Sequence, residues 1–219
     1  MVYIVENNGV YGLTKGQFSA TADRGSTSKK GVVNPDAPVD LVGLALQLGA
    51  TYVARGFSGD KAQMVPLIKG AILHGGAAFI DIISPCVTFN NHVGSTRSYD
   101  YVREHNEAVS RIDFIDLAPE QIAEPVPGEV IEVPQPDGAM LRLRKLHTDY
   151  DPTDRVGAMN HVLAHQAQGE IVTGLLFVEA AAQDLHDALG TTARPLNSLG
   201  EAELCPGAAT LAKLNLGLR

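Results

Sequence analysis

Short apolar runs and segments of helical periodicity alternate along the first half of the chain. Three runs have the length and composition of strands, and they cover Val2–Val5, Thr51–Arg55 and Ala77–Ser84. Between them, apolar residues recur every three or four positions, which predicts helices over Asp36–Gly49 and Asp60–His74. The third run, A-A-F-I-D-I-I-S, is nearly continuous, as in the central strand of a parallel sheet. This alternation predicts an α/β fold with a doubly wound, mostly parallel sheet.

The second half of the chain begins with a predicted β-hairpin. Alternating apolar and polar residues flank Asp137-Gly138, a dipeptide typical of hairpin turns, and predict a small antiparallel appendage over Gly128–Leu146. A helix is then expected over Arg155–Gln168 and an apolar strand over Ile171–Val178. The tail, Ala180–Arg219, contains two short helical patterns.

Two segments of unusual composition interrupt these elements. Phe18–Pro38 is rich in Ser, Thr, Gly and Lys, which is typical either of a solvated loop or of a lid over a ligand. Pro119–Pro136 is rich in proline and marks a change in the character of the chain. We therefore expect a division into a ligand-binding domain over residues 1–112 and a carboxyl-terminal region over residues 113–219.

Composition and charge exclude two classes of partner. The net charge of −8 and the pI near 5.3 argue against non-specific nucleic-acid binding, which needs a basic surface to neutralise phosphates. No run approaches the roughly 18 to 20 apolar residues that span a membrane, and no signal peptide is recognisable. The two cysteines form no disulfide framework, so we expect a reducing, cytoplasmic compartment.

The first strand run, Val2–Val5, is apolar and rich in β-branched residues, which predicts a buried strand, and it ends in a polar corner, Glu6-Asn7-Asn8-Gly9, which predicts a tight turn. Because ligands of open α/β sheets bind beyond the carboxyl ends of strands, the side chain of Asn8 stands where it could face a ligand. Mg²⁺ prefers carboxamide and carbonyl oxygens, so the Asn8 side chain and the Val10 carbonyl are candidates for half of a magnesium site. The alternative is an ordinary Asn-Gly turn.

Cys86 follows the third strand run, directly after Pro85, and has three interpretations. It could be a buried apolar residue, a nucleophile with His92 as its base, or an iron–sulfur ligand. A 4Fe–4S cluster needs four thiolates, so the last interpretation requires three cysteines elsewhere, which Cys205 alone does not supply. If the strands are parallel, Cys86 and Asn8 project from the same edge of the sheet.

Two motifs together carry a family resemblance. Asn-Asn-x-x-Tyr-Gly-Leu-Thr-x-Gly-Gln begins at Asn7 and resembles the diphosphate–magnesium loop of thiamine-diphosphate enzymes, and Ser-Pro-Cys-x-x-Phe-Asn begins at Ser84. Both resemble, in order, the β subunit of the 2-oxoacid:ferredoxin oxidoreductases, and the similarity extends over Val2–Asp154. The resemblance implies that residues 1–112 are the carboxyl-terminal part of the thiamine-diphosphate-binding domain. It also implies that residues 113–219 end in a tail that contacts another subunit.

The resemblance assigns a role to individual residues of both motifs. In the family, the residues matching Asn8 and Val10 hold Mg²⁺, and the residue matching Cys86 is the last ligand of a 4Fe–4S cluster. The diphosphate is bound at the positions of Gly12, Leu13 and Thr14.

Lys15 is a candidate for substrate recognition. A lysine three residues after Gly12 would point into the mouth of the active site, where its flexible point charge could pair with the distal carboxylate of an acidic substrate. The alternative is a surface lysine. In the family, pyruvate enzymes commonly carry glycine at this place, so the lysine favours 2-oxoglutarate or a broad range of 2-oxoacids.

Part of the family pattern is missing from the sequence. No Gly-Asp-Gly occurs, although its aspartate completes the magnesium shell in the family, and the first three cluster cysteines are absent. The chain also opens inside a strand run. We therefore expect the amino-terminal part of the fold to be missing, with this chain the carboxyl-terminal part of a longer subunit or the product of a truncated reading frame, and inactive alone.

The resemblance implies oxidative decarboxylation of a 2-oxoacid with coenzyme A. The products would be an acyl-CoA and CO₂, with electrons passing through the 4Fe–4S cluster to ferredoxin, and an α subunit would supply the rest of the active site. Two alternatives stay open: a non-oxidative thiamine-dependent decarboxylase or synthase, and a non-catalytic remnant that only assembles with an α subunit.

Overall fold

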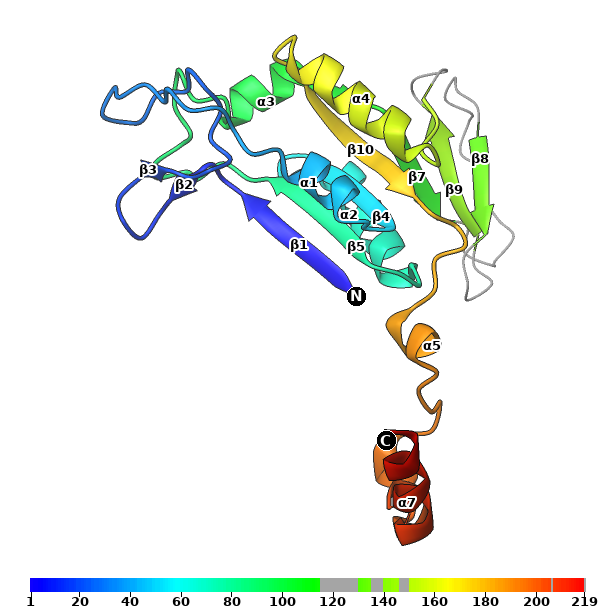
Figure 1. Ribbon diagram of the computed structural model, residues 1–219. Coiled ribbons are helices and arrows are strands. Elements are labelled where there is room, and N and C mark those ends of the chain that lie inside the picture. Colours follow the sequence, from blue (N-terminus) through cyan, green and yellow to red (C-terminus); the bar gives the residue numbers. More distant parts are fainter. Residues whose placement is uncertain (115–129, 135–139, 146–149, 206, 219) are drawn as a thin grey trace. The chain divides into compact units, whose positions relative to one another are not determined.

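The computed structural model describes residues 1–114, 130–134, 140–145, 150–205 and 207–218 (Figure 1). It forms two compact units, Met1–Asp184 and Leu185–Arg219. In the first unit, a five-stranded sheet has the strand order β1-β5-β4-β10-β6. The bounds are β1 Val2–Asn7, β5 Ala78–Ile83, β4 Tyr52–Phe57, β10 Ile171–Val178 and β6 Asn106–Ala108. The predicted α/β fold with a mostly parallel sheet is confirmed: β1, β5 and β4 are mutually parallel, β10 is antiparallel to β4, and β6 is parallel to β10.

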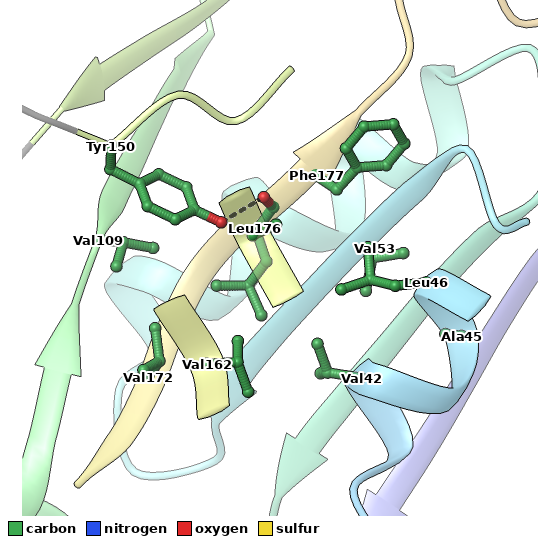
Figure 2. Close-up of a cluster of buried hydrophobic side chains, with 11 residues drawn as sticks. Val42, Ala45, Leu46, Val53, Val109, Tyr150, Val162, Val172, Leu176 and Phe177 are labelled. Carbon is green, nitrogen blue, oxygen red and sulfur yellow. Dashed lines mark hydrogen bonds between the residues drawn. The ribbon is translucent and has the colours of Figure 1, made fainter. Parts of the chain in front are cut away.

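Helices cover both faces of this sheet. Adjacent strand residues point to opposite sides, and apolar residues on both sides need a covering helix. Tyr52 and Ala54 pack with α2 (Lys61–Leu73) on one face. Val53 packs with α1 (Leu41–Gln47) and α4 (Arg155–Gln166) on the other, and Figure 2 shows this second cluster. α2 and α4 begin at or next to their predicted first residues, whereas α1 begins at Leu41, later than the predicted Asp36. Each helix begins after an aspartate, Asp40, Asp60 or Asp154, whose side chain accepts a hydrogen bond from at least one backbone N–H group of the first turn. The remaining helix of this unit, α3 (Tyr99–His105), follows a loop beyond β5.

β1 corrects one prediction about burial. The run Val2–Val5 forms a strand, as predicted, but Val2, Tyr3 and Ile4 are 37%, 60% and 41% exposed. Within the part of the chain that the structure describes, β1 pairs with β5 on one side only. An apolar strand is buried only where neighbours cover it, so sequence pattern alone overestimated its burial.

Two smaller antiparallel sheets accompany the main one. β8 (Val130–Pro134) and β9 (Met140–Lys145) pair antiparallel, which confirms the predicted hairpin arms, while the turn Asp137-Gly138 lies outside the described residues. β7 (Ser110–Phe114), which sequence periodicity did not predict, pairs with β9. The other small sheet pairs β2 (Val10–Tyr11) with β3 (Gln17–Phe18).

The second unit is short and helical. It contains α5 (Leu185–Leu189), a 3₁₀ turn at Leu196–Ser198, α6 (Glu201–Leu204) and α7 (Gly207–Gly217). The predicted domain boundary between residues 112 and 113 stays a prediction. Among the described residues, no helix has the length and apolar character needed to cross a membrane.

The buried tyrosine Tyr52 gives the fold a sensitivity to alkaline pH. Its hydroxyl donates to the Leu67 carbonyl at 2.8 Å, and burial raises the pKa of Tyr52. In the unfolded chain the Tyr52 hydroxyl ionises near pH 10, whereas in the folded chain it stays protonated to higher pH. The contribution of Tyr52 to the free energy of unfolding is therefore complete below pH 10 and decreases above it, by up to about 1.4 kcal/mol per pH unit. We expect Tyr52→Phe to lower the free energy of unfolding at pH 7 by about 1 kcal/mol and to make the alkaline decline shallower. Urea unfolding between pH 7 and 11 checks both effects.

Tyr11→Phe is the matched control for that experiment. Tyr11 is 56% exposed, so its substitution should change neither the stability at pH 7 nor the alkaline slope. An unchanged alkaline slope in Tyr52→Phe would show that Tyr52 does not govern this behaviour.

Candidate functional site

The candidate magnesium loop follows β1 directly. The Asn8 side-chain oxygen accepts a hydrogen bond from the Val10 N–H at 3.0 Å, which turns the chain sharply at the strand end. Gly9 has a φ of +70°, a left-handed conformation that glycine adopts without steric conflict. Asn8 is half-buried and Val10 is 7% exposed. The predicted tight turn is therefore present, and a hydrogen bond holds the Asn8 side-chain oxygen beside Val10.

The diphosphate-binding residues predicted from the family lie in the hairpin loop between β2 and β3. Gly12, Leu13 and Thr14 are all exposed, and Leu13 is 99% exposed. A Cβ atom placed on Gly12 would meet nothing within 4 Å, so open space lies beside this backbone. The loop is closed by hydrogen bonds from the Lys15 N–H to the Gly12 carbonyl (3.1 Å) and from the Gly16 N–H to the Tyr11 carbonyl (3.0 Å).

Lys15 adopts a strained backbone conformation in this loop. Its φ is +71°, and among the described residues it is the only non-glycine residue with a positive φ. For an L-residue other than glycine, this region is unfavourable by roughly 1–2 kcal/mol. The side chain is exposed. A lysine held where glycine would be more stable fits the hypothesis that the side chain has a function.

Cys86 lies beyond the carboxyl end of β5, half-buried after the buried residue Pro85. Because β1 and β5 are parallel, with Asn7 opposite Ile83, both candidate loops leave the sheet at the same edge, as the sequence predicts. The Ser84 N–H donates to the Asn7 carbonyl at 3.0 Å, which continues the strand pairing up to the loops. Asn8 and Cys86 thus begin neighbouring loops.

Two residues that sequence reasoning did not select connect these loops. The Asn90 side-chain amide donates to the Asn8 carbonyl at 2.7 Å. Phe89 lies against Gly16, where a Cβ atom would come within 3.1 Å of the Phe89 side chain. Both residues belong to the Ser-Pro-Cys-x-x-Phe-Asn motif, so the motif itself was the available signal.

A buried charge network supports the loops from within the sheet. The Arg55 guanidinium donates to Asp81 (Nε to Oδ2, 2.9 Å) and to Asp40 (Nη2 to Oδ1, 2.8 Å). Asp81 accepts from the Asn7 side chain at 3.0 Å, and Asn7 accepts from the Thr21 hydroxyl at 2.7 Å. Burial lowers the pKa of Arg55, but Asp40 and Asp81 outweigh it, so the pKa is raised on balance. Sequence reasoning missed this network.

A cleft opens at the same edge of the sheet. It has a volume of about 250 Å³ and is lined among others by Arg24, Tyr101 and Glu170. Burial and the nearby Asp23 carboxylate raise the pKa of Tyr101, although Arg97 opposes them. The lining does not include Asn8, Val10, Gly12 or Cys86, so the cleft is distinct from the candidate cofactor loops.

The Asn8 side-chain oxygen and the Val10 carbonyl oxygen are suitable ligands for a hard cation. A carboxamide oxygen has two lone pairs, and the Val10 N–H occupies only one of them on Asn8. Amide and carbonyl oxygens are ligands that Mg²⁺ accepts. Within the described residues, no three or more His, Cys, Asp or Glu side chains gather in a group that could hold a metal ion. Cys86 would therefore need iron ligands beyond these residues.

Comparison with known proteins agrees with this geometry. Residues 1–82 match the family described as thiamine pyrophosphate enzyme, C-terminal TPP binding domain. A 2-oxoacid:ferredoxin oxidoreductase subunit beta from Sulfolobus sp is 39% identical over 127 residues, which are 58% of this chain and 41% of the relative. The 2-oxoglutarate synthase subunit KorB from Methanocaldococcus jannaschii is 30% identical over 146 residues, which are 63% of this chain and 52% of the relative.

A solved structure extends the similarity to the fold. A 2-oxoglutarate:ferredoxin oxidoreductase from Magnetococcus marinus, with 2-oxoglutarate, coenzyme A and succinyl-CoA bound, aligns with a TM-score of 0.57 and 28% identity. The alignment covers 90% of this chain and 55% of that one. This chain thus spans about half of the length of the relatives it matches, or less. Residues 1–82 are thus similar to the C-terminal TPP-binding domain of thiamine pyrophosphate enzymes, and the chain is similar, over part of their length, to β subunits of the 2-oxoacid:ferredoxin oxidoreductases.

Proposed function

We propose that the chain acts as β subunit in a thiamine-diphosphate-dependent 2-oxoacid:ferredoxin oxidoreductase. The reaction is the oxidative decarboxylation of a 2-oxoacid with coenzyme A, which yields acyl-CoA and CO₂. The preferred 2-oxoacid is 2-oxoglutarate. Electrons pass through a 4Fe–4S cluster to ferredoxin, in the cytoplasm. The observation that carries this proposal is that the Asn8 loop and the Cys86 loop leave adjacent parallel strands and are joined by a hydrogen bond.

The first loop is the proposed cofactor site. The Asn8 side-chain oxygen and the Val10 carbonyl hold Mg²⁺, and the exposed backbone at Gly12, Leu13 and Thr14 binds the diphosphate. Thiamine diphosphate, when bound, supplies the electron sink that decarboxylation of a 2-oxoacid requires. The protein binds and orients the cofactor, and the Asx turn at Asn8 keeps the metal ligands in place before the cofactor arrives.

The second loop is the proposed cluster site. Cys86 supplies one thiolate to the 4Fe–4S cluster, and the three others lie outside this chain, as the family resemblance implies. An α subunit completes the active site. The exposed apolar edge of β1 is consistent with a site that further polypeptide completes.

Intact mass, iron content and thiamine content of the purified protein test this proposal together. A mass above 23.2 kDa, with about four irons and one thiamine diphosphate for each copy of the chain, supports the oxidoreductase. Thiamine diphosphate without iron favours the non-oxidative decarboxylase or synthase. A mass near 23.2 kDa with neither cofactor favours the non-catalytic remnant, and turnover after addition of an α subunit then decides between remnant and incomplete enzyme.

Lys15→Gly separates the proposed substrate role of Lys15 from its effect on stability. Glycine relieves the left-handed strain at φ +71°, so we expect the free energy of unfolding to rise by about 1 kcal/mol. The loss of a charge-assisted contact should lower kcat/KM for 2-oxoglutarate by about tenfold relative to pyruvate. Denaturant unfolding and competing-substrate kinetics of the assembled enzyme measure the two effects.

Lys15→Met is the control for that substitution. Methionine keeps the strained backbone and removes only the charge, so selectivity should fall without a gain in stability. Unchanged preference for 2-oxoglutarate in both variants would reduce Lys15 to a surface lysine.

A further inference from the structure

Asn90 is a buried side chain that reaches from the Cys86 loop to the Asn8 loop. Its exposed fraction is 2%, and its Nδ2 atom lies 2.7 Å from the Asn8 carbonyl, 82 positions away in sequence. The Asn90 Oδ1 atom accepts from the Ser95 hydroxyl at 2.7 Å. Because a backbone carbonyl only accepts hydrogen bonds, the amide group must face Asn8 and the oxygen must face Ser95. The orientation of the side chain is therefore determined by its two partners.

The backbone of Asn90 is tied to Cys86. The N–H groups of Phe89 and Asn90 donate to the Cys86 carbonyl at 3.1 Å and 2.7 Å, which forms a tight turn directly after the cysteine. Asn90 therefore holds Cys86 through its backbone and Asn8 through its side chain. A displacement of either loop is transmitted to the other through one residue.

Little room remains between the two loops. A Cβ atom placed on Gly9 would lie 3.1 Å from the Asn90 Nδ2 atom and 3.2 Å from the Arg97 side chain. At the other end of the same segment, Phe89 lies equally close to Gly16. The segment from Asn8 to Gly16 thus packs against Asn90 and Phe89. A change at Asn90 is therefore expected to move the Asn8 turn.

The geometry points to Asn90 as a positioning residue for the metal and diphosphate loop. By orienting the Asn8 carbonyl, Asn90 sets where the Asn8 side-chain oxygen and the following Val10 carbonyl stand, and it does so relative to Cys86. The inference rests on the proposed function for its magnesium role. Asn90 itself is assigned no contact with metal, cofactor or substrate.

Hydrogen exchange of the cofactor-free protein tests the positioning step alone. Asn90→Asp keeps the size of the side chain and replaces the donor facing the Asn8 carbonyl with a second acceptor. We expect the amides of the segment 9–19 to exchange faster by about tenfold, since local opening becomes easier, while those of β4 stay unchanged. Peptide-resolved exchange followed by mass spectrometry measures this. Exchange equal to that of wild type in a folded variant would overturn the inference.

Binding of magnesium and thiamine diphosphate to the protein, with the subunits that accompany it, tests the consequence. In Asn90→Asp, the apparent Kd for Mg²⁺ at a fixed thiamine diphosphate concentration should rise by about tenfold, with kcat largely retained at saturating Mg²⁺. A merely structural role would lower the amount of folded enzyme without changing this Kd. If wild type binds no thiamine diphosphate, the proposed function fails, whereas hydrogen exchange still decides the role of Asn90.

Asn91→Asp is the matched control, one residue along the loop. Asn91 is exposed and its side-chain oxygen accepts from the Tyr99 N–H at 3.0 Å, which a carboxylate also does. Exchange and Kd should therefore match wild type. If Asn90→Asp does not fold, Ser95→Ala is tested instead. It removes the hydroxyl that donates to the Asn90 oxygens and accepts from the Arg97 N–H, and it keeps the Asn90 amide. A rise of about threefold in the Kd for Mg²⁺ is expected there, and an unchanged Kd would contradict the inference.

Discussion

Replacing Arg55 with methionine is expected to lower the free energy of unfolding by about 3–5 kcal/mol. The guanidinium is 10% exposed and joins Asp81, which is 1% exposed, to Asp40. Methionine fills much of the same volume, but it leaves the Asp81 carboxylate buried, with a hydrogen bond from the neutral Asn7 side chain in place of a charged partner. An uncompensated buried charge is far less favourable than a paired one, so the loss should be large. Denaturant unfolding of the purified variant measures it.

Arg103→Met provides the same substitution at the surface. Arg103 and Asp100 are 62% and 93% exposed and 4.0 Å apart, so this pair should contribute no more than about 0.5 kcal/mol. A decrease below about 1 kcal/mol for Arg55→Met would mean that water or rearrangement neutralises the Asp81 charge.

The Arg55 network also reaches the candidate site. Asp81 binds the Asn7 side chain, and Asn7 directly precedes the metal-ligand candidate Asn8. Asp40, at the other end, is the N-cap of α1. Its carboxylate also accepts hydrogen bonds from two backbone N–H groups, which hold it in place. One buried cation thus connects a helix start, a central strand and the end of β1. We expect Arg55→Met to destabilise the candidate cofactor loop as well as the fold.

Sequence periodicity predicted β1, β4, β5 and β10 of the main sheet, because burial and secondary structure coincide there, but it missed the short strand β6. The run 77–84 is nearly continuously apolar and forms β5, an inner strand between β1 and β4, and the N-caps Asp40 and Asp60 determine where α1 and α2 begin. The burial of β1 was overestimated because it depends on a neighbour that a local pattern does not contain. β7 was missed because its pairing with β9 joins distant parts of the chain.

The candidate site was predictable to the extent that strand direction determines it. Asn8 and Cys86 follow parallel neighbouring strands, so their loops had to share an edge once the sheet was recognised. The hydrogen bond between Asn90 and Asn8 was not predictable, because no spacing rule relates residues 82 positions apart. The same holds for Arg55, which ends an apolar run and meets both carboxylates only in the folded chain.

Under the proposed function, substitution of Cys86 with alanine should remove iron and leave the thiamine site intact. Only the backbone carbonyl of Cys86 takes part in the turn that holds Phe89 and Asn90, and alanine retains that carbonyl. The Asn8 turn and its bond to Asn90 should therefore persist. We expect iron to fall from about four per chain to near zero, reduction of ferredoxin to cease, and bound thiamine diphosphate to stay near the wild-type amount.

Cys205→Ala is the control, because Cys205 is the other free cysteine and is exposed. Its iron content and activity should equal those of wild type. If Cys86→Ala keeps its iron, the thiol is a packing residue and the non-oxidative alternative gains support. If Cys86→Ala loses thiamine diphosphate together with iron, the two loops depend on each other more strongly than the hydrogen bonds between them indicate, and the cluster itself must help to hold the Asn8 turn. Parallel measurement of iron, thiamine diphosphate and ferredoxin reduction distinguishes these outcomes.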